Sequence, residues 1–308
     1  MSADGERAPA NTTVAFIGLG IMGAPMAGHL LDAGYQVIGY NRSRPAVDRL
    51  VAKGAKAAGS AAEAARGADV VITMVPDSPD VEEITVGEDG FYAVAKPGLL
   101  HIDCSTIRPD VARRIAEVGA QQGIRVVDAP VSGGEAGAVE GILSIMVGGA
   151  PDDVEAAMPY LNVVGKTIVH VGPAGSGQTV KAANQLIVAG NIQLVAEALV
   201  FLEAHGVDTE AATEVLAGGL AGSTVLNRKA ANMRAREFTP GFRIDLHHKD
   251  LGIVTAAARE AGVAIPLGAA VAQLVGALRA QGHGGLDHSA LLLLVEQLSG
   301  RTSRPGTG

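Results

Sequence analysis

Short apolar runs alternate with helical patterns through the first part of the chain. The runs that predict strands lie at 14–17, 36–40, 68–75, 99–103, 125–128, 142–147 and 167–171. Strands that alternate with helices predict an α/β fold with a doubly wound, mainly parallel sheet. We therefore expect an N-terminal Rossmann-type domain over residues 14–173, preceded by a loose tail at 1–13.

The strand signals stop beyond about residue 173, and helical periodicity takes over. The predicted helices lie near 176–205, 208–217, 223–235, 247–262, 266–281 and 287–298. In the first of them, apolar residues recur in steps of three and four at Val180, Ala183, Ile187, Leu194, Ala198 and Phe201 or Leu202. At about 1.5 Å per residue this helix would be roughly 45 Å long. We expect an all-α C-terminal domain over 174–300 and a loose tail at 301–308.

A glycine-rich turn joins the first strand to the first helix. It reads Gly18-Leu19-Gly20-Ile21-Met22-Gly23. Strand, G-x-G-x-x-G, helix and second strand within about thirty residues form the dinucleotide-binding fingerprint. Gly18 permits the tight turn, Gly20 lets the backbone approach a pyrophosphate, and Gly23 lets the helix pack on the strand. Exposed N–H groups around Ile21 and Met22 would hold the phosphates.

The end of the second strand selects the cofactor. An acidic residue there would bind the ribose hydroxyl of NAD, but the chain reads Asn41-Arg42-Ser43-Arg44. Guanidinium groups suit a 2′-phosphate, and the missing carboxylate removes its repulsion. The sequence favours NADP over NAD. The alternative is that the arginines begin the next helix and face solvent.

Three further predicted strands end in segments that could contact a ligand. Ligands bind beyond the carboxyl ends of strands in such sheets. Val75-Pro76, Ser105-Thr106 and Ser132-Gly133-Gly134 are therefore expected on the ligand-binding rim. Free N–H groups after Ser132 could hold a carboxylate, although an ordinary flexible loop has the same composition.

Lys181 and Asn184 lie near the start of the long predicted helix. Three residues apart, they share one helix face. Spacing alone leaves Lys181 as either a solvated surface residue or a site residue. Further on, His247 and His248 are adjacent and point about 100° apart on a helix, so they do not converge on a metal. We expect no metal site.

Composition limits the classes of function. The 308 residues carry a net charge of −8, and aromatic residues are 3% with no tryptophan. Nucleic acid is therefore not an expected partner.

The one cysteine, Cys104, excludes an intramolecular disulfide and is compatible with a reducing cytosol, so a cytoplasmic location is expected. Asn191, Gln193 and Glu197 interrupt the most apolar stretch, which therefore indicates a buried helix and no membrane span.

Four ordered motifs together resemble the β-hydroxyacid dehydrogenase family, which includes the 3-hydroxyisobutyrate dehydrogenases. The resemblance covers residues 14–298. Its motifs are Phe16 to Gly23, Asp128 to Gly134, Lys181-x-x-Asn184 and Lys249-Asp250-Leu251. Segments 218–226, 240–247 and 287–291 are most similar to the tartronate semialdehyde reductase branch of that family.

The resemblance implies an NAD(P)-dependent oxidoreductase that reduces 2-hydroxy-3-oxopropanoate to glycerate. Lys181 would be the catalytic residue and Asn184 its partner. Ser132-Gly133-Gly134 would hold the substrate carboxylate, with Gln185 and Phe242 also expected at the substrate, while Thr106 and Lys249 would lie near the nicotinamide. Relatives with a second asparagine at the position of Gln185 leave open which amide contacts the substrate.

Alternatives remain. The chain could be another member of the family, such as a 3-hydroxyisobutyrate dehydrogenase or a succinic semialdehyde reductase. Imine reductases share the build but usually lack this lysine. From another class, it could be a non-catalytic binding module. Apolar runs at 269–278 and 291–295 exceed what a small helical domain needs to bury, so we expect a homodimer or homotetramer assembled through helical domains.

Overall fold

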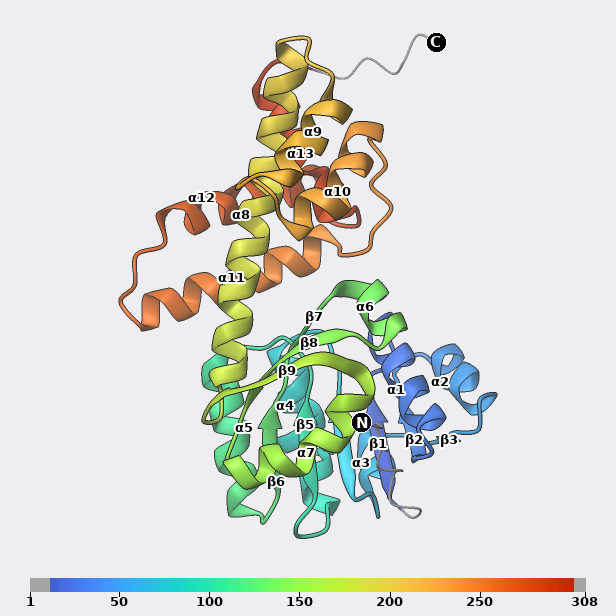
Figure 1. Ribbon diagram of the computed structural model, residues 1–308. Helices are drawn as coiled ribbons and strands as arrows, with labels where there is room; N and C mark the ends of the chain where they lie inside the picture. Colours follow the sequence, from blue (N-terminus) through green and yellow to red (C-terminus); the bar gives the residue numbers. More distant parts are fainter. Residues whose placement is uncertain (1–11, 302–308) are drawn as a thin grey trace, which may run out of the picture. The chain divides into compact units, whose positions relative to one another are not determined.

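The computed structural model describes residues 12–301. It divides into two compact units: the first runs to Lys181 and the second begins at Ala182. Both predicted tails lie almost wholly outside the described residues. Helix α8 (Ser176–Ala204) is continuous through the boundary, which falls after its sixth residue (Figure 1).

In its described residues, the first unit is built on one nine-stranded sheet. Its strands are β1 (Thr13–Ile17), β2 (Gln36–Tyr40), β3 (Lys56–Ala57), β4 (Val70–Thr73), β5 (Leu100–Asp103), β6 (Arg125–Asp128), β7 (Val131–Ser132), β8 (Leu143–Gly148) and β9 (Gly165–Gly172). The order is β3-β2-β1-β4-β5-β6-β8-β7, and β9 pairs with β8. The pairs from β3 to β6 are parallel, whereas β8 runs antiparallel to β6 and β7. The predicted mainly parallel sheet is confirmed.

Alternate strand residues form a core on each face of this sheet. Val14 and Phe16 of β1 belong to one core, and Ala15 and Ile17 belong to the other. Because both faces of the sheet are buried, most residues of the central strands are apolar. The helices of the unit are α1 (Gly23–Asp32), α2 (Arg44–Val51), α3 (Ala61–Ala65), α4 (Ser78–Val86), α5 (Pro109–Gln121), α6 (Gly134–Glu140) and α7 (Pro151–Val164). Residues of α1, α2 and α7 join the first core, and residues of α3, α4 and α5 join the second.

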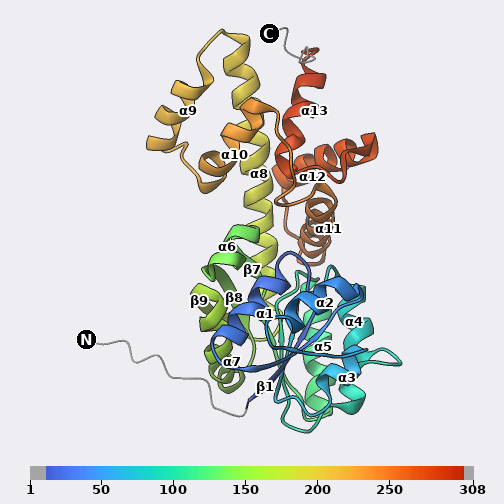
Figure 2. The ribbon, with the colours of Figure 1, turned by 90° about the vertical axis from the view of Figure 1, so that its right-hand side faces the viewer.

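The second unit is helical, as the sequence predicts. Around the remainder of α8 it contains α9 (Thr209–Gly218), α10 (Thr224–Ala235), α11 (Ile244–Glu260), α12 (Pro266–Leu278) and α13 (Leu291–Leu298). Helices α9 and α10 lie on one side of α8, and α11 and α12 lie on the other (Figure 2). Its core gathers Ile192 and Leu199 of α8 with Met233, Val275 and Leu291.

Two interpretations of apolar residues are corrected by this packing. The run at 291–295 is largely buried, and the larger apolar residues of 269–278, such as Val275, lie in the core while its small residues Ala269, Ala270 and Ala277 are exposed, so the two runs do not form the large exposed apolar surface that we expected. The exposed apolar stripe lies on α8, where Ile187, Leu194 and Phe201 are 63%, 62% and 62% exposed. The apolar repeat that predicted α8 therefore lies mostly on the exposed face of this helix. The buried face of α8 carries smaller and polar residues as well.

Of the described helices, α8 is the one long and apolar enough to cross a membrane by composition. Its other face lies in the core of the second unit, where Ala189, Ile192 and Ala196 are fully buried. A core helix has this arrangement.

Candidate active site

The glycine-rich turn has the geometry that the fingerprint requires. Gly18 has φ +99° and donates its N–H to the carbonyl of Tyr40 at 2.9 Å. A Cβ atom there would overlap the carbonyl of Met74, and one on Gly23 would overlap the carbonyl of Gly18. These glycines are needed because the backbone turns and packs with no room for a side chain.

The same turn leaves donors open for an anion. Within residues 12–301, the backbone N–H groups of Gly20, Ile21 and Met22 have no hydrogen-bond acceptor. A Cβ on Gly20 would meet nothing within 4 Å, and Ile21 is 53% exposed. Three free N–H groups at the N-terminus of α1, beside open space, fit the pyrophosphate of a dinucleotide.

Of the polar residues that follow β2, Asn41 has a structural role and Arg44 faces solvent. Asn41 accepts the N–H of Leu19 at 3.0 Å and donates to the carbonyl of Ser43, so it ties the strand end to the glycine-rich turn. Arg44 begins α2 and pairs with Asp48, as the solvent-facing alternative expects.

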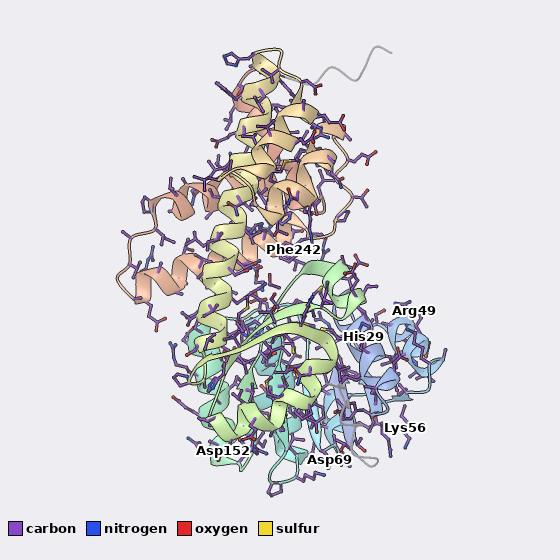
Figure 3. The ribbon with its side chains drawn as sticks, in the orientation of Figure 1. His29, Arg49, Lys56, Asp69, Asp152 and Phe242 are labelled. Carbon is purple, nitrogen blue, oxygen red and sulfur yellow. The ribbon has the colours of Figure 1, made fainter. Side chains whose placement is uncertain are left out.

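Arg42 is in a different position from Arg44. Its side chain is 75% exposed and lies 3.2 Å from the carboxylate of Asp80, on the neighbouring α4. An incoming 2′-phosphate would compete with that carboxylate for the guanidinium. Arg49 and Lys56 project from α2 and β3 near the same edge of the sheet (Figure 3).

A rigid rim forms where β4 and β5 end. Ser105 is fully buried and accepts the N–H of Val75 at 3.0 Å, which joins the two predicted rim segments. Pro76 is exposed and Thr106 is half-buried. The rim therefore presents Thr106 and Pro76, while Ser105 holds the two loops together.

Under this rim lies a buried polar chain that the sequence analysis missed. Thr73 gives its hydroxyl proton to Asp103 at 2.7 Å and lies 3.0 Å from Nε2 of His101. A threonine has one hydroxyl proton, so Nε2 of His101 carries the ring proton and donates to Thr73. Nδ1 then accepts the hydroxyl proton of Tyr92 at 2.8 Å.

Burial shifts the pKa values of His101 and Asp103 in the directions that favour their neutral forms. It lowers the pKa of His101 from 6.5 to about 3. Burial also raises the pKa of Asp103, and the neighbouring Asp128 carboxyl contributes in the same direction. The pKa of the Cys104 thiol is raised by burial too, so this cysteine is an inert core residue.

Asp128 anchors the start of α8 to the end of β6. Its carboxylate accepts the N–H of Gly175 at 2.7 Å and the N–H of Gln178 at 2.9 Å. A Cβ on Gly148 or on Gly177 would overlap neighbouring backbone atoms at this contact. A carboxylate at a helix N-terminus is stabilised by the helix dipole, although burial raises the pKa of Asp128. The first turn of α8 is therefore fixed on the sheet.

Lys181 is one turn further along α8 and is buried, with 7% exposed. Its ammonium donates to the carbonyl of Val131 at 2.7 Å. Val131 directly precedes Ser132-Gly133-Gly134, where β7 ends at Ser132 and α6 begins at Gly134, and Gly133 and Gly134 have φ of +142° and +66°. The predicted lysine and the predicted carboxylate loop thus meet within the first unit, and the solvated-surface alternative for Lys181 is wrong.

His29 of α1 supports the helix that follows this loop. Its Nε2 lies 3.1 Å and 3.0 Å from the carbonyls of Ala138 and Val139 in α6 (Figure 3). The cofactor-binding helix and the carboxylate loop are therefore linked through α6.

The other predicted site residues belong to the second unit. Asn184 donates to the side-chain oxygen of Gln185 at 2.8 Å, and Gln185 donates to Asp250. Lys249 pairs with Asp250 at 2.8 Å. Gln185 is 5% exposed and uses both ends of its amide here, whereas Asn184 is half-buried. Of the two amides, Asn184 is the more accessible, and its contact with a substrate stays a prediction.

Phe242 precedes α11 and packs on two buried histidines. Its ring centroid lies 5.6 Å from that of His247 and 5.4 Å from that of His288. Its N–H donates to the carboxylate of Asp287, which also accepts a hydrogen bond from the ammonium of Lys229. The ring of Phe242 therefore packs against α11 through His247. Among residues 12–301, no group of three or more His, Cys, Asp or Glu side chains has the arrangement of a metal site.

Asp128 and Gln178 are the main site residues that sequence reasoning missed as such. Asp128 stands at the end of a strand, within a motif that we noted for its Ser-Gly-Gly portion. Gln178 precedes Lys181 by three residues, so it lies on the same helix face. Both signals were available, but only the tertiary contacts give them meaning.

Comparison with known proteins agrees with this geometry. Residues 13–172 match the family model described as the NAD-binding domain of 6-phosphogluconate dehydrogenase. Residues 175–295 match the NAD-binding model of NADP-dependent 3-hydroxyisobutyrate dehydrogenase.

Curated relatives and solved structures are similar over nearly their full length. The chain is 42% identical to 2-hydroxy-3-oxopropionate reductase of Escherichia coli K12, over 92% of this chain and 97% of that protein. It is 40% identical to an NAD-dependent L-serine dehydrogenase of Pseudomonas aeruginosa, over 94% and 99%. A structure of Mycobacterium tuberculosis 3-hydroxyisobutyrate dehydrogenase with L-serine has 35% identity and a TM-score of 0.85, over 92% and 99%.

Proposed function

The chain belongs to the β-hydroxyacid dehydrogenase family, and on that basis we propose that it reduces 2-hydroxy-3-oxopropanoate to glycerate with NADPH, reversibly. Oxidoreduction with a nicotinamide cofactor follows from the family. The choice of this semialdehyde and of NADPH is the proposal.

One contact carries the substrate proposal. The ammonium of Lys181 binds the carbonyl of Val131, next to Ser132, at 2.7 Å. A group that polarises a carbonyl oxygen and a loop suited to a carboxylate therefore lie side by side. A substrate that uses both must carry its carboxylate only a few atoms from the reacting carbon, as a small β-hydroxyacid or semialdehyde does.

The chain's residues have distinct roles in this reaction. The bound cofactor supplies the hydride. Lys181 stabilises the negative charge that develops on the substrate oxygen and donates the proton to it. The loop at 132–134 orients the carboxylate with its N–H groups, and Asn184, on the same face of α8 as Lys181, orients the substrate hydroxyl or the lysine.

For the cofactor, we propose NADPH over NADH. The turn at 18–23 fits a pyrophosphate, and no acid stands at Asn41, Arg42 or Ser43. The description of the second family model supports NADP, while the L-serine dehydrogenase relative is named for NAD. Arg42 would exchange Asp80 for the 2′-phosphate.

We also propose a homodimer or homotetramer assembled through the helical units, in the cytoplasm. The support is now the stripe on α8, since Ile187, Leu194 and Phe201 are exposed at seven-residue spacing. Such spacing lets a second helix pack along the whole stripe.

The test is a panel of initial rates. The purified protein is assayed with tartronate semialdehyde, succinic semialdehyde, 3-hydroxyisobutyrate and L-serine, each with both cofactors in the appropriate direction. We expect the highest kcat/KM for tartronate semialdehyde with NADPH. A higher value for L-serine or 3-hydroxyisobutyrate would reassign the substrate within the family. Cofactor binding without turnover of any of them would favour the non-catalytic binding module.

A further inference from the structure

Gln178 is a buried glutamine with an unusual set of contacts. It lies in the first turn of α8 and is 1% exposed. Its side-chain nitrogen donates to the carbonyl of Ser105 at 2.8 Å, and its side-chain oxygen accepts the N–H of Ile107 at 3.0 Å. The amide thus pairs with the loop as a neighbouring strand would.

The two atoms that Gln178 binds flank Thr106. The carbonyl of Ser105 and the N–H of Ile107 belong to the peptide groups on either side of that residue. Holding both fixes the backbone of Thr106 in position and direction. Thr106 is half-buried on the rim, at the position that the family resemblance implies for the nicotinamide.

The other end of Gln178 is equally constrained. Its own N–H donates to Asp128 at 2.9 Å, which fixes this turn of α8 on β6. Lys181 follows three residues later on the same face of the helix, about 4.5 Å along the axis. One rigid turn therefore joins the loop that carries Thr106 to the residue that we propose as the proton donor.

We propose that Gln178 is a positioning residue that sets the place of Thr106 relative to Lys181. The inference rests on the proposed function for its catalytic consequence. Its structural part, the clamp on residues 105–107, concerns cofactor binding as well. Gln178 contacts neither reacting group itself, so its effect on the rate would come from alignment.

Alignment of this kind affects turnover strongly, since a displacement of about 1 Å costs on the order of a hundredfold. We expect Gln178→Ala to lower kcat by about ten- to a hundredfold, within that range. Binding of NADPH should weaken because the rim near its nicotinamide is loosened. Binding of 2′-phospho-ADP-ribose, which lacks the nicotinamide, should stay unchanged.

Gln178→Glu gives a sharper readout. A protonated carboxyl has the shape of the amide, donates to Ser105 and accepts from Ile107, whereas an ionised one repels the Ser105 carbonyl. The charged or titratable groups of the adjoining elements are Asp128, which accepts the N–H of Gln178, Asp103, which pairs with Asp128 in the register of β5 and β6, and Lys181, three residues along α8. We expect kcat relative to wild type to be near one at acidic pH and to fall as the pH rises. Gln178→Ala should show a deficit that does not vary with pH.

Gln193→Ala is the matched control. Gln193 lies on the same helix and is 5% exposed, with its amide bound to Glu197. This variant should keep the kcat, the affinities and the pH profile of the wild type. Melting temperatures of all variants are measured alongside.

The outcomes separate the two proposals. If the wild type turns over no substrate of the panel, the proposed function fails, and the comparison of NADPH with 2′-phospho-ADP-ribose still tests the clamp. If the wild type prefers NADH, the same comparison of binding is made with NADH and ADP-ribose in place of NADPH and 2′-phospho-ADP-ribose. If Gln178→Ala keeps more than half of the wild-type kcat and NADPH affinity, the inference is overturned. Equal losses in kcat, fragment affinity and melting temperature would also overturn it, because they indicate a merely structural role.

Discussion

The buried His101 should make the first unit sensitive to acid. Its imidazole is neutral in the fold, where it accepts from Tyr92 and donates to Thr73. Burial lowers its pKa to about 3, from 6.5 in an exposed histidine. Its contribution to stability is therefore complete above about pH 6.5 and is lost as the pH falls toward 3. The perturbation is His101→Gln, which removes this titration.

The size of the effect follows from linkage. At pH 5 the unfolded histidine binds a proton with a pKa of about 6.5, while the folded one remains neutral, which destabilises the fold by about 2 kcal/mol relative to pH 7. This figure depends on the unfolded pKa, because any folded pKa near 3 leaves the imidazole neutral at pH 5. Asp103 has the opposite sign, since its raised pKa favours the folded state on acidification, and it is present in both proteins.

The assay is urea unfolding followed by tyrosine fluorescence. All four tyrosines, Tyr35, Tyr40, Tyr92 and Tyr160, lie in the first unit, and the chain has no tryptophan. The signal therefore reports on the unit that contains His101. The wild type should lose about 2 kcal/mol more than His101→Gln between pH 7 and pH 5, whatever the variant's stability at pH 7.

Tyr92→Phe is the control for the loss of a hydrogen bond. It removes the donor to His101 but keeps the imidazole, so its unfolding free energy should be lower at both pH values with the wild-type dependence on pH. The reasoning is refuted if wild type and His101→Gln lose the same unfolding free energy between pH 7 and pH 5.

Three further predictions concern catalysis, cofactor and assembly. Lys181→Ala should lower kcat on the order of a thousandfold with little change in cofactor affinity, and Lys181→Arg should not restore it; a residual rate above about a tenth of wild type would contradict the catalytic role. Arg42→Ala should narrow the preference for NADPH measured as a ratio of kcat/KM values, and equal or better use of NADH by the wild type would contradict the cofactor proposal. Leu194→Glu should dissociate the oligomer in light scattering, whereas Leu220→Glu, at an exposed position outside the α8 stripe, should not; a monomeric wild type at micromolar concentration would contradict the assembly.

Much of the fold could be predicted because it depends on residues that are close together in the sequence. Gly18, Gly20 and Gly23 could be assigned roles because a positive φ and a close backbone approach depend on the missing Cβ alone. The helices after residue 173 were predicted because periodicity of 3.6 is a property of each segment by itself. The spacing of Lys181 and Asn184 placed them on one helix face for the same reason.

Pairing between distant segments could not be predicted from the sequence. Val131 and Ser132 looked like part of a loop, yet they form β7 because β8 lies alongside them. Two residues are too few to show periodicity, so only the partner strand defines them. Likewise the apolar stripe on α8 predicted a helix but not its exposure, because burial depends on which faces the neighbouring helices cover.

The sequence by itself determined the two-part architecture, the dinucleotide fingerprint and the chemistry-bearing residue types, since each depends on neighbours within a few positions. Only the tertiary structure decided which of those residues act together. Asp128 and Gln178 lie 50 residues apart, and Gln178 and Ser105 lie 73 apart. Their contacts exist because parallel strands end at one edge of the sheet and α8 begins there, an arrangement set by the packing of the whole first unit.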